Sequence, residues 1–343
     1  MDAAVAVFFT MAVTRPSVAG LGSGGQCVLF NEKAKRAEAL DFIPPPGVPG
    51  APRGMYALHA KYGRLRWEQM VTPAENLARF GFNVSRGFAR DLAAASAVLA
   101  DNPNLARLYV GTNGRLPLEG ERMNQLDLAA TLGLLRRSPG EFYGGNFLQA
   151  YIDGAQAGGI NLNAETMRRY APQFRETIKV TFDLLDSHFA PTPGGMVASR
   201  MWQALAVEGQ YRRTAAAARP ALFAETQARA VAQSVSGVSE LPLGAAQAGA
   251  SFVIADQDSN TVACAFTMGR MFGTAKLAGD SGIVIAAPAT GGEALAVAPM
   301  LTVNPRVNKM FFAAAGRAGR AARHVRAARQ IRPLALGADG DAG

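Results

Sequence analysis

One stretch of the chain, Gly249–Ile285, constrains the fold more than any other. It holds an apolar run at Phe252–Ala255, a polar turn at Asp256–Asn260 and a second apolar run at Thr261–Met268. Two short β-rich runs joined by a polar turn predict a β-hairpin. The glycine-rich segment that follows suits backbone that must approach another part of the molecule closely. We therefore expect this hairpin to organise the rest of the fold.

Composition limits the classes of protein that the chain can form. With 343 residues, 49% of them hydrophobic, the chain can build a substantial core as one large or two ordinary domains. A net charge of +9 makes acidic partners plausible, and the positive charge gathers late in the chain. Two cysteines are too few for a disulfide framework or a metal site, and three scattered histidines argue against a histidine-built metal centre. We expect structural roles for these five residues and no cofactor: Cys27, Cys264, His59, His188 and His324.

The first residues predict a buried helix. Met1–Thr14 is apolar, but it lacks a basic start, carries Asp2 and shows no cleavage site, so it does not read as a secretory signal. Its apolar run is too short to cross a bilayer, and no transmembrane segment is expected. The glycines of Gly20–Gly25 precede a strand at Gln26–Phe30 and not a helix, which favours a tight turn over a dinucleotide-binding loop.

Between this strand and the hairpin the chain alternates helical patterns with turns. Gly54–Phe82 predicts two helices around Tyr62-Gly63, because its leucines and aromatics recur at helical spacing. The remaining expected elements are helices within Ser85–Leu108 and Asn124–Leu135, a strand at Ile178–Leu185, a glycine turn and helix within Phe189–Gln203, an alanine-rich helix at Gly209–Ala232, and a flexible stretch at Ser234–Gly249.

Several of these segments resemble the γ-glutamyltranspeptidase family. The matching motifs are D-A-A-V at Asp2–Val5, G-V-P-G at Gly47–Gly50, the helical pattern of Leu65–Leu77, F-Y-G at Phe142–Gly144, and D-x-D-x-N followed by F-G-T and G-D-S-G-I within Ala255–Ile285. Members are N-terminal-nucleophile (Ntn) hydrolases, which cut their own chain to expose a threonine. The resemblance implies an α/β fold, the αββα four-layer sandwich of Ntn hydrolases.

The resemblance also implies how the chain is divided. Residues 1–248 correspond to the family's large subunit and residues 249–332 to its small subunit, within one domain, and residues 333–343 form a disordered tail. Family members normally carry a further helix, and often a signal peptide, before the segment matched by Asp2–Val5. We therefore expect an N-terminally shortened member, or a misplaced start. The location would be cytoplasmic if the start is correct and periplasmic if a signal peptide is missing.

The family's catalytic positions are where the sequence departs from the pattern. Counting back from the hairpin turn places the threonine nucleophile on Gly249, which has no side chain to attack a carbonyl or to drive self-cleavage. Ile43 stands where an arginine grips the substrate α-carboxylate, a bidentate contact that no apolar residue can replace. Thr267 matches the threonine that activates the nucleophile, and Gly269 stands where a polar group holds the substrate amine.

Further polar groups of the family pattern are missing. Val284–Ala289 has no carboxylate for the substrate ammonium, Ala294–Leu301 has lost a serine pair, and Thr192–Gly195 keeps two glycines without paired serines. The glycine pair of the oxyanion hole aligns only loosely with Ala315–Gly319. Loss of several members of a catalytic unit together removes most of the rate enhancement. The sequence therefore predicts a catalytically inactive, uncleaved protein that serves as a structural or interaction subunit of a larger complex.

The alternative is an active hydrolase or transferase that acts on glutathione-like γ-glutamyl compounds. Ser251 lies two residues beyond the nucleophile position, hence on the same face of the strand, although cleavage at Ala250–Ser251 would need a register shift. Thr267 is the other candidate hydroxyl. Cys264 lies between two alanines on the second strand, which favours a small buried residue over a thiol nucleophile.

Arginines dominate the end of the chain. Ala313–Ile331 predicts a helix, because alanine and arginine are strong helix formers, and Pro333 would end it. Six arginines recur there at intervals of three: Arg317, Arg320, Arg323, Arg326, Arg329 and Arg332. Two interpretations stay open, a solvated helix face and a docking surface for an acidic protein or an anionic membrane. Nucleic acid is not expected, because no aromatic residues interleave the arginines to stack on bases.

Overall fold

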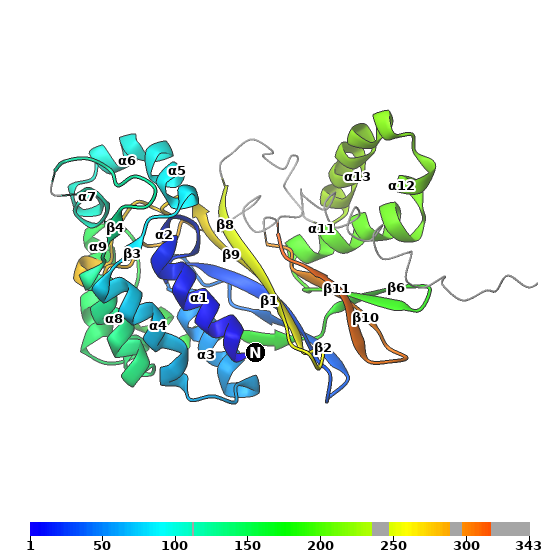
Figure 1. Cartoon of the computed structure of the whole chain (residues 1–343), viewed down its shortest axis with the longest axis horizontal. Coiled ribbons are helices and arrows are strands. Elements are labelled where there is room, and N and C mark those ends of the chain that lie inside the picture. The colour runs from blue at the N-terminus through cyan, green and yellow to red at the C-terminus, as the bar shows by residue number, and fades with distance from the viewer. Residues whose placement is uncertain (112, 235–246, 289–296, 317–343) are drawn as a thin grey trace, which may run out of the picture.

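The computed structural model describes residues 1–111, 113–234, 247–288 and 297–316 (Figure 1). Two antiparallel β-sheets pack face to face, and helices cover the outer side of each sheet. The layers therefore run helix, sheet, sheet, helix, which confirms the expected α/β four-layer sandwich.

The first sheet joins strands that are far apart in the sequence. Its strand order is β5 (Gln173–Arg175), β2 (Arg36–Asp41), β1 (Gly24–Asn31), β9 (Thr261–Arg270) and β8 (Gln247–Ala255). The predicted hairpin is confirmed as β8–β9. Its turn is held by the Asp256 carboxylate, which accepts hydrogen bonds from the backbone N–H groups of Asp258 at 3.0 Å and Asn260 at 2.9 Å. The boundary expected between residues 248 and 249 falls inside β8.

Helices cover the outer face of the first sheet. The longer ones are α1 (Asp2–Thr14), α3 (Gly50–Tyr62), α4 (Trp67–Phe80), α8 (Leu126–Arg137) and α9 (Asn146–Ala157). Shorter elements lie around them: α2 (Pro16–Ala19), β3 (Phe82–Asn83), α5 (Arg86–Ala94), α6 (Ser96–Ala100), α7 (Pro103–Tyr109), β4 (Arg122–Met123), η1 (Glu141–Tyr143), α10 (Ala164–Arg169) and η4 (Gly279–Ser281). As predicted, α1 is buried: Phe8 and Phe9 are fully inaccessible, and the Phe8 ring stacks on that of Phe266 with centroids 4.8 Å apart.

The second sheet lies against the inner face of the first. Its order is β11 (Lys309–Ala314), β10 (Met300–Asn304), β7 (Leu185–Phe189) and β6 (Ile178–Phe182). The elements on its side of the molecule are α11 (Pro193–Trp202), η2 (Gln203–Val207), α12 (Gln210–Arg213), η3 (Ala216–Ala218) and α13 (Arg219–Ser234). The predicted turn before α11 is confirmed, with Thr192 as the N-cap residue.

Strand alternation sorts the first sheet into two faces. One face packs on the helices and the other packs on the second sheet. Along β1, Cys27 and Leu29 belong to the large helix-facing core, whereas Val28 and Phe30 belong to the core between the sheets. The hairpin positions that were predicted to take part in catalysis, Gly249 and Thr267, lie on the face toward the second sheet.

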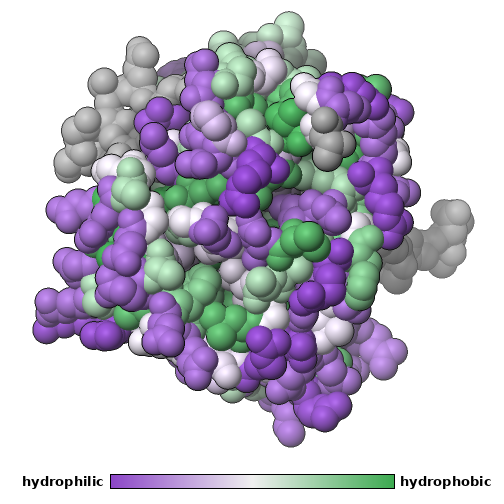
Figure 2. Space-filling model, turned by 90° about the vertical axis from the view of Figure 1, so that its left-hand side faces the viewer, coloured by the Kyte–Doolittle hydropathy of each residue, from purple (hydrophilic) through white to green (hydrophobic). Residues whose placement is uncertain are grey.

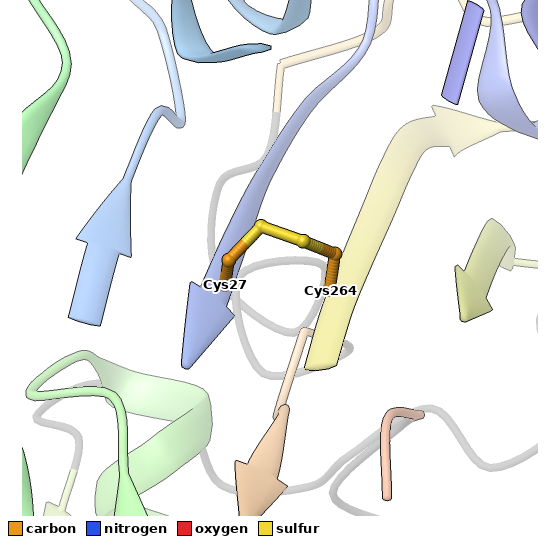
Figure 3. Close-up of a disulfide and its surroundings, with 2 residues drawn as sticks. All are labelled: Cys27 and Cys264. Atoms are coloured by element: carbon orange, nitrogen blue, oxygen red, sulfur yellow. A yellow bond between two sulfur atoms is a disulfide. The ribbon is translucent and has the colours of Figure 1, made fainter. Parts of the chain in front are cut away.

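The two cysteines form a disulfide with each other, a pairing that was not predicted from the sequence (Figure 3). Cys27 of β1 and Cys264 of β9 occupy directly opposite positions of adjacent strands, with Cα atoms 4.1 Å apart, and both are fully buried. A count of cysteines could not show that two residues with a sequence separation of 237 lie on neighbouring strands. The bond also removes Cys264 as a candidate thiol nucleophile.

Three predicted elements differ from the structure. Ile178–Leu185 is not one strand, because Asp183 takes a left-handed conformation with φ of 56° and turns the chain into the β6–β7 hairpin. The helix predicted over Gly209–Ala232 is interrupted, since Thr214 and Ala215 are extended and Pro220 lies in the first turn of a new helix.

The third difference concerns the start of the arginine-rich helix predicted over Ala313–Ile331. Ala313 and Ala314 lie in β11, where pairing with β10 overrides the helix propensity of alanine. Arg317, Arg320, Arg323, Arg326, Arg329 and Arg332 lie outside the described residues. Within the described ranges, no helix is long and apolar enough to cross a membrane.

Candidate functional site

The positions that the sequence assigned to catalysis meet on the inner face of the first sheet. In the strand register, Gly249 of β8 lies opposite Thr267 of β9, which in turn lies opposite Gly24 of β1. Thr267 therefore stands between two glycines. This arrangement brings the nucleophile position and its expected activator together, as the resemblance implied, but supplies only one side chain.

A side chain at Gly249 would clash with one backbone atom of the neighbouring strand. A Cβ atom built on Gly249 would lie 2.8 Å from the carbonyl oxygen of Phe266, closer than real Cβ contacts come. The strand register also shifts between Ala248 and Gly249, at a β-bulge. At the position predicted for the nucleophile, the chain therefore has no side chain, and adding one would require the backbone to shift.

Thr267 is bound into the turn that follows its strand. Its side chain is buried, and its Oγ1 accepts a hydrogen bond from the backbone N–H of Gly269 at 2.9 Å. Gly269 has φ of +72°, and a Cβ there would lie 2.7 Å from the carbonyl oxygen of Ala287. The position where the family pattern places a substrate-holding polar group thus requires glycine.

Ile43 and three prolines close over this end of the sheet. A small cavity of about 20 Å³ remains there, with room for about one water molecule. A Cβ on Gly24 would lie 2.4 Å from Cδ of Pro44, which shows how tightly the proline segment packs on β1. Thr267 is the polar side chain among the described lining residues, which are Gly24, Ile43, Pro44, Pro45, Pro46, Gly47, Val48, Thr267, Ala286, Ala287 and Pro288.

A carboxylate, not a guanidinium, lies near the expected substrate-carboxylate grip. Asp41 is two residues before Ile43, and its Oδ1 accepts a hydrogen bond from the Ile43 backbone N–H at 3.2 Å. Burial raises the pKa of the Asp41 carboxyl, and that hydrogen bond and the nearby Arg175 partly oppose the rise. When ionised, this group repels a carboxylate ligand, which is the opposite of a carboxylate grip.

Ser251, the alternative nucleophile, makes a structural contact. It lies opposite Ala265 of β9, and its Oγ donates a hydrogen bond to the carbonyl oxygen of Ala315 at 3.0 Å. This bond joins the edge of the first sheet to the residue after β11. The hydroxyl is exposed and lies on the same face as Gly249.

The other predicted site segments contribute no polar group where they are described. Val284 and Ile285 are buried hydrophobic residues, and the Ala287 N–H donates to the carbonyl of Met268 at 3.0 Å. Residues 294–296 and 317–319 lie outside the described chain. Across the described ranges, no group of three or more His, Cys, Asp or Glu side chains could hold a metal ion.

The two described histidines lie apart from the Thr267 cavity. His188 of β7 contacts Thr177 Oγ1 through Nδ1 at 2.7 Å, and burial lowers the pKa of its imidazole to about 4. His59 of α3 lies 2.8 Å from the carbonyl oxygen of Leu65 through Nε2. His324 is outside the described residues.

Sequence reasoning missed a buried polar pair beside the site. Gln26 of β1 accepts a hydrogen bond through Oε1 from the Thr192 hydroxyl at 2.8 Å, linking the first sheet to the start of α11. Thr192 was noted only for the glycine turn that follows it. The signal available was a glutamine inside an otherwise apolar strand, which requires a buried partner.

These layers and this hairpin define the class of N-terminal-nucleophile hydrolase folds. Among solved structures, the chain is similar to the cephalosporin acylase from Bacillus halodurans, with a TM-score of 0.74 and 19% identity over 91% of this chain and 72% of that one. It is also similar to the γ-glutamyltranspeptidase from Pseudomonas nitroreducens complexed with L-DON, with a TM-score of 0.58 and 25% identity over 67% of this chain and 76% of that one.

Within that class, the chain belongs to the γ-glutamyltranspeptidase family. The family model for γ-glutamyltranspeptidase matches residues 43–239, which is more than half of the chain. Human glutathione hydrolase 7 is 30% identical over 197 residues, covering 50% of this chain and 29% of that protein. The Escherichia coli (strain K12) glutathione hydrolase proenzyme is 24% identical over 356 residues, covering 83% of this chain and 61% of that protein.

The family assignment predicted from the sequence is thereby confirmed. The chain nevertheless spans only part of these curated relatives, since it covers 34% of the length of Arabidopsis thaliana glutathione hydrolase 3 and 29% of the human protein.

Proposed function

We propose that this protein is a catalytically inactive γ-glutamyltranspeptidase-like protein that stays uncleaved and acts as a structural or interaction subunit. One observation carries the proposal. At the position that aligns with the nucleophile, Gly249 has no side chain, and a Cβ atom there would lie 2.8 Å from the Phe266 carbonyl oxygen. A chain with no hydroxyl at this position lacks the group that would begin self-cleavage.

The substrate end of the site supports the same proposal. A cavity of about 20 Å³ is far below the roughly 300 Å³ at which small-molecule pockets begin. Ile43 contributes no charge, and the nearby Asp41 carboxylate is held by the Ile43 backbone. A γ-glutamyl group would need a cation for its carboxylate and an anion for its ammonium, and the described cavity lining offers neither.

The interaction role rests on the arginine-rich segment. Its six arginines lie outside the described residues, so the proposal draws on the sequence alone. Their positive charge fits an acidic protein surface or an anionic membrane surface, and attraction between exposed charges weakens as salt screens it. We therefore expect the chain to co-purify with an acidic partner at low salt and to lose it at high salt. Binding that is unchanged in the triple variant Arg320→Gln, Arg323→Gln, Arg326→Gln would contradict this part.

Hydrolysis of a chromogenic γ-glutamyl anilide tests the catalytic part. The purified chain is expected to release no amine above the uncatalysed rate. The alternative, an active γ-glutamyl hydrolase or transferase, predicts release that Ser251→Ala or Thr267→Val abolishes. Ser17→Ala serves as a matched control, because this buried hydroxyl bonds Asp91 and neither residue lines the Thr267 cavity. Turnover lost in either of the first two variants and kept in the control would overturn the proposal.

A further inference from the structure

A larger hollow opens on a different part of the molecule from the Thr267 cavity. Its volume is about 240 Å³, and it is bordered by α7, the end of α9 and the loop of residues 276–280. We call it the polar pocket; its lining residues are Asn102, Asn104, Arg107, Gly154, Ala157, Gly158, Lys276, Leu277, Gly279 and Asp280. It shares no lining residue with the Thr267 cavity.

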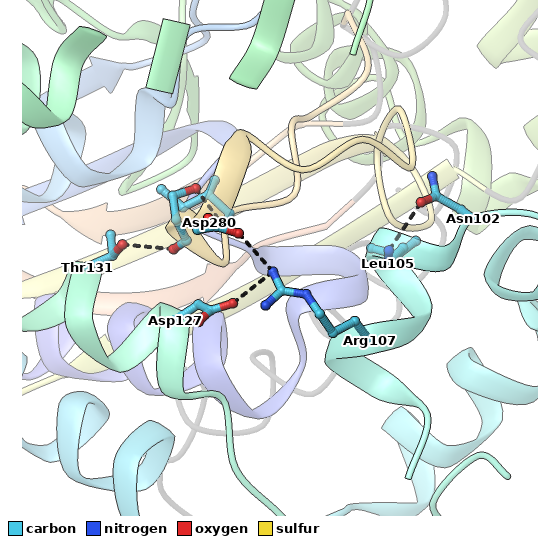
Figure 4. Close-up of polar contacts among 8 residues, drawn as sticks. Asn102, Leu105, Arg107, Asp127, Thr131 and Asp280 are labelled. Atoms are coloured by element: carbon cyan, nitrogen blue, oxygen red, sulfur yellow. Dashed lines mark hydrogen bonds and ion pairs between the residues drawn. The ribbon is translucent and has the colours of Figure 1, made fainter. Parts of the chain in front are cut away.

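Hydrogen bonds hold the walls of the polar pocket in place. Asn102 caps α7 by accepting the Leu105 N–H at 3.1 Å, and its amide donates to the carbonyl of Ala275 in the facing loop. Thr131 of α8 donates to the carbonyl of Ser281 at 2.8 Å, which holds the other end of that loop (Figure 4). Because the walls are preformed, a ligand would not have to order them on binding.

Arg107 is held between two carboxylates. Figure 4 shows its guanidinium reaching between Asp127 of α8 and Asp280, with Nη2 at 3.1 Å and 3.2 Å from their oxygens. This geometry sets Arg107 in place but engages one of its three nitrogens. The Asp280 side chain stays 95% exposed, so its carboxylate remains open to a ligand.

Lys276 supplies a second cation on the loop side of the polar pocket. The stem of its side chain lies over Gly158, since a Cβ on Gly158 would be 3.3 Å from the Lys276 Cβ. In the described part of the chain, no ion pair or hydrogen bond is assigned to the Lys276 ammonium, whereas Arg107 has two carboxylates. The lining therefore offers an ammonium at Lys276 and, at Asp280, a carboxylate that pairs with Arg107 through one oxygen and is otherwise exposed.

We propose that the polar pocket binds a small zwitterion, a molecule with one carboxylate and one ammonium group, of which a free amino acid is the simplest form. The carboxylate would face Lys276 and the amide of Asn104, and the ammonium would face Asp280. A dianion would be repelled by Asp280 and Asp127, and an apolar ligand would leave the lining polar groups without partners. The volume of about 240 Å³ is just below the roughly 300 Å³ at which pockets for small molecules begin, which suits a ligand as small as an amino acid.

The surface around the polar pocket is mixed in character. Figure 2 shows the side of the molecule to which α7 and α9 belong in Figure 1, where hydrophilic and hydrophobic side chains alternate. A small polar ligand fits the charges of the pocket, and its binding does not depend on whether the Thr267 site is active.

Calorimetric titration of the folded chain with free amino acids tests the proposal, with L-serine, L-glutamine and L-arginine as probes. Each probe is paired with its N-acetyl form and its carboxamide form, which remove one charge at a time, and inorganic phosphate serves as a simple anion. We expect saturable binding of at least one free amino acid. Both of its modified forms should bind about tenfold more weakly or worse, because each lacks one charge-assisted contact.

Two variants locate the binding. Lys276→Met removes the ammonium, and Ala157→Phe fills the hollow from an exposed position on α9; both should weaken binding about tenfold or more. Lys33→Met, in the turn between β1 and β2, is the matched control and should bind as the unchanged chain does. Circular dichroism and the urea midpoint verify that each variant is folded. No saturable binding of any free amino acid, equal binding of the modified forms or of phosphate, or unchanged binding by folded Lys276→Met would overturn the proposal.

Discussion

The two faces of the β8–β9 hairpin differ in their residues: one face packs into the hydrophobic core, and the other holds Gly249 and Thr267. On the helix side, Phe252, Cys264 and Phe266 pack into the large core, and Phe266 lies 4.8 Å from Phe8 and 5.6 Å from Phe42 between ring centroids. On the side toward the second sheet, Gly249 lies opposite Thr267, and Thr267 lines a cavity of about 20 Å³.

This difference shows how a protein can keep its fold while the residues at its active-site positions change. Alternate residues of one strand point to opposite faces, so the face that holds the sandwich together can stay intact while the other changes. The helix-facing residues keep the family's architecture. At the positions facing the second sheet, Gly249 lacks the side chain that the resemblance to the family predicts for catalysis. We therefore expect substitutions on the two faces to have different effects. Those on the helix-facing side should change stability, and those on the side facing the second sheet should not change the predicted lack of activity.

The largest effect is expected on the helix-facing side. Phe266→Ala should lower the free energy of unfolding by about 3–5 kcal/mol, because a fully enclosed ring leaves a cavity among Phe8, Phe42 and Phe252. Urea unfolding followed by circular dichroism measures the loss. Ser251→Ala, on the other face of the hairpin, is the control and should change stability by about 0.5 kcal/mol or less. Equal losses in the two variants would break the comparison.

The disulfide on the same face should have the next largest effect. Replacing both Cys27 and Cys264 by alanine should cost about 2–4 kcal/mol, since the bond restrains the unfolded chain. Thiol titration of the unfolded, unreduced protein should find no reactive thiol, and titration after reduction should find both. Two reactive thiols before reduction would show that the bond does not form.

Acid should weaken the second sheet through His188. Burial lowers the pKa of His188 to about 4, below the ordinary value of about 6.5, so the folded state favours the neutral ring. The unfolded state binds more protons between these values. Protonation of His188 therefore leaves the free energy of unfolding unchanged above about pH 6.5 and lowers it by roughly 2–3 kcal/mol as the pH falls toward 4.

The variant His188→Gln isolates this contribution, because other acidic groups titrate in the same range. The difference in unfolding free energy between the original chain and the variant should shrink as the pH falls from 7 to 4. A difference that is constant across that range would rule out a neutral buried imidazole.

A smaller effect is expected at the nucleophile position. Gly249→Ala should destabilise the chain by about 1–3 kcal/mol, because the added Cβ would lie 2.8 Å from the Phe266 carbonyl oxygen. Gly249→Thr should be destabilised as well and should remain uncut, which sharpens the comparison by showing that the hydroxyl alone is not enough. Self-cleavage of Gly249→Thr would mean that the site has kept its catalytic geometry.

Much of the fold could be predicted from the sequence, because its signals are local. The apolar α1, the hairpin β8–β9 and the helices on either side of Tyr62-Gly63 follow from periodicity and turn residues. The Cys27–Cys264 bond could not be predicted in this way, since it depends on the pairing of strands that are far apart in the sequence. The alanine-rich sequence also led to a wrong prediction of helix at Ala313 and Ala314. These residues belong to a sheet that the local pattern does not reveal.

The candidate site was predicted in part. The resemblance led to Gly249, Ile43, Thr267 and Gly269, and the structure gathers them at one end of the first sheet, although their roles stay predictions. The polar pocket escaped notice because its charged residues, Arg107, Lys276 and Asp280, come from distant segments with no motif. Such groups are recognised only when the fold places them together.

The mass of the purified chain tests the central claim most directly. The Cys27–Cys264 disulfide would hold two fragments together, so the protein must be reduced and unfolded before mass spectrometry. We predict a single species with the mass of the uncut chain, 36.0 kDa. Two fragments that separate only after reduction, the second with a free amino group on Ser251 or another hydroxyl residue near Gly249, would contradict the account.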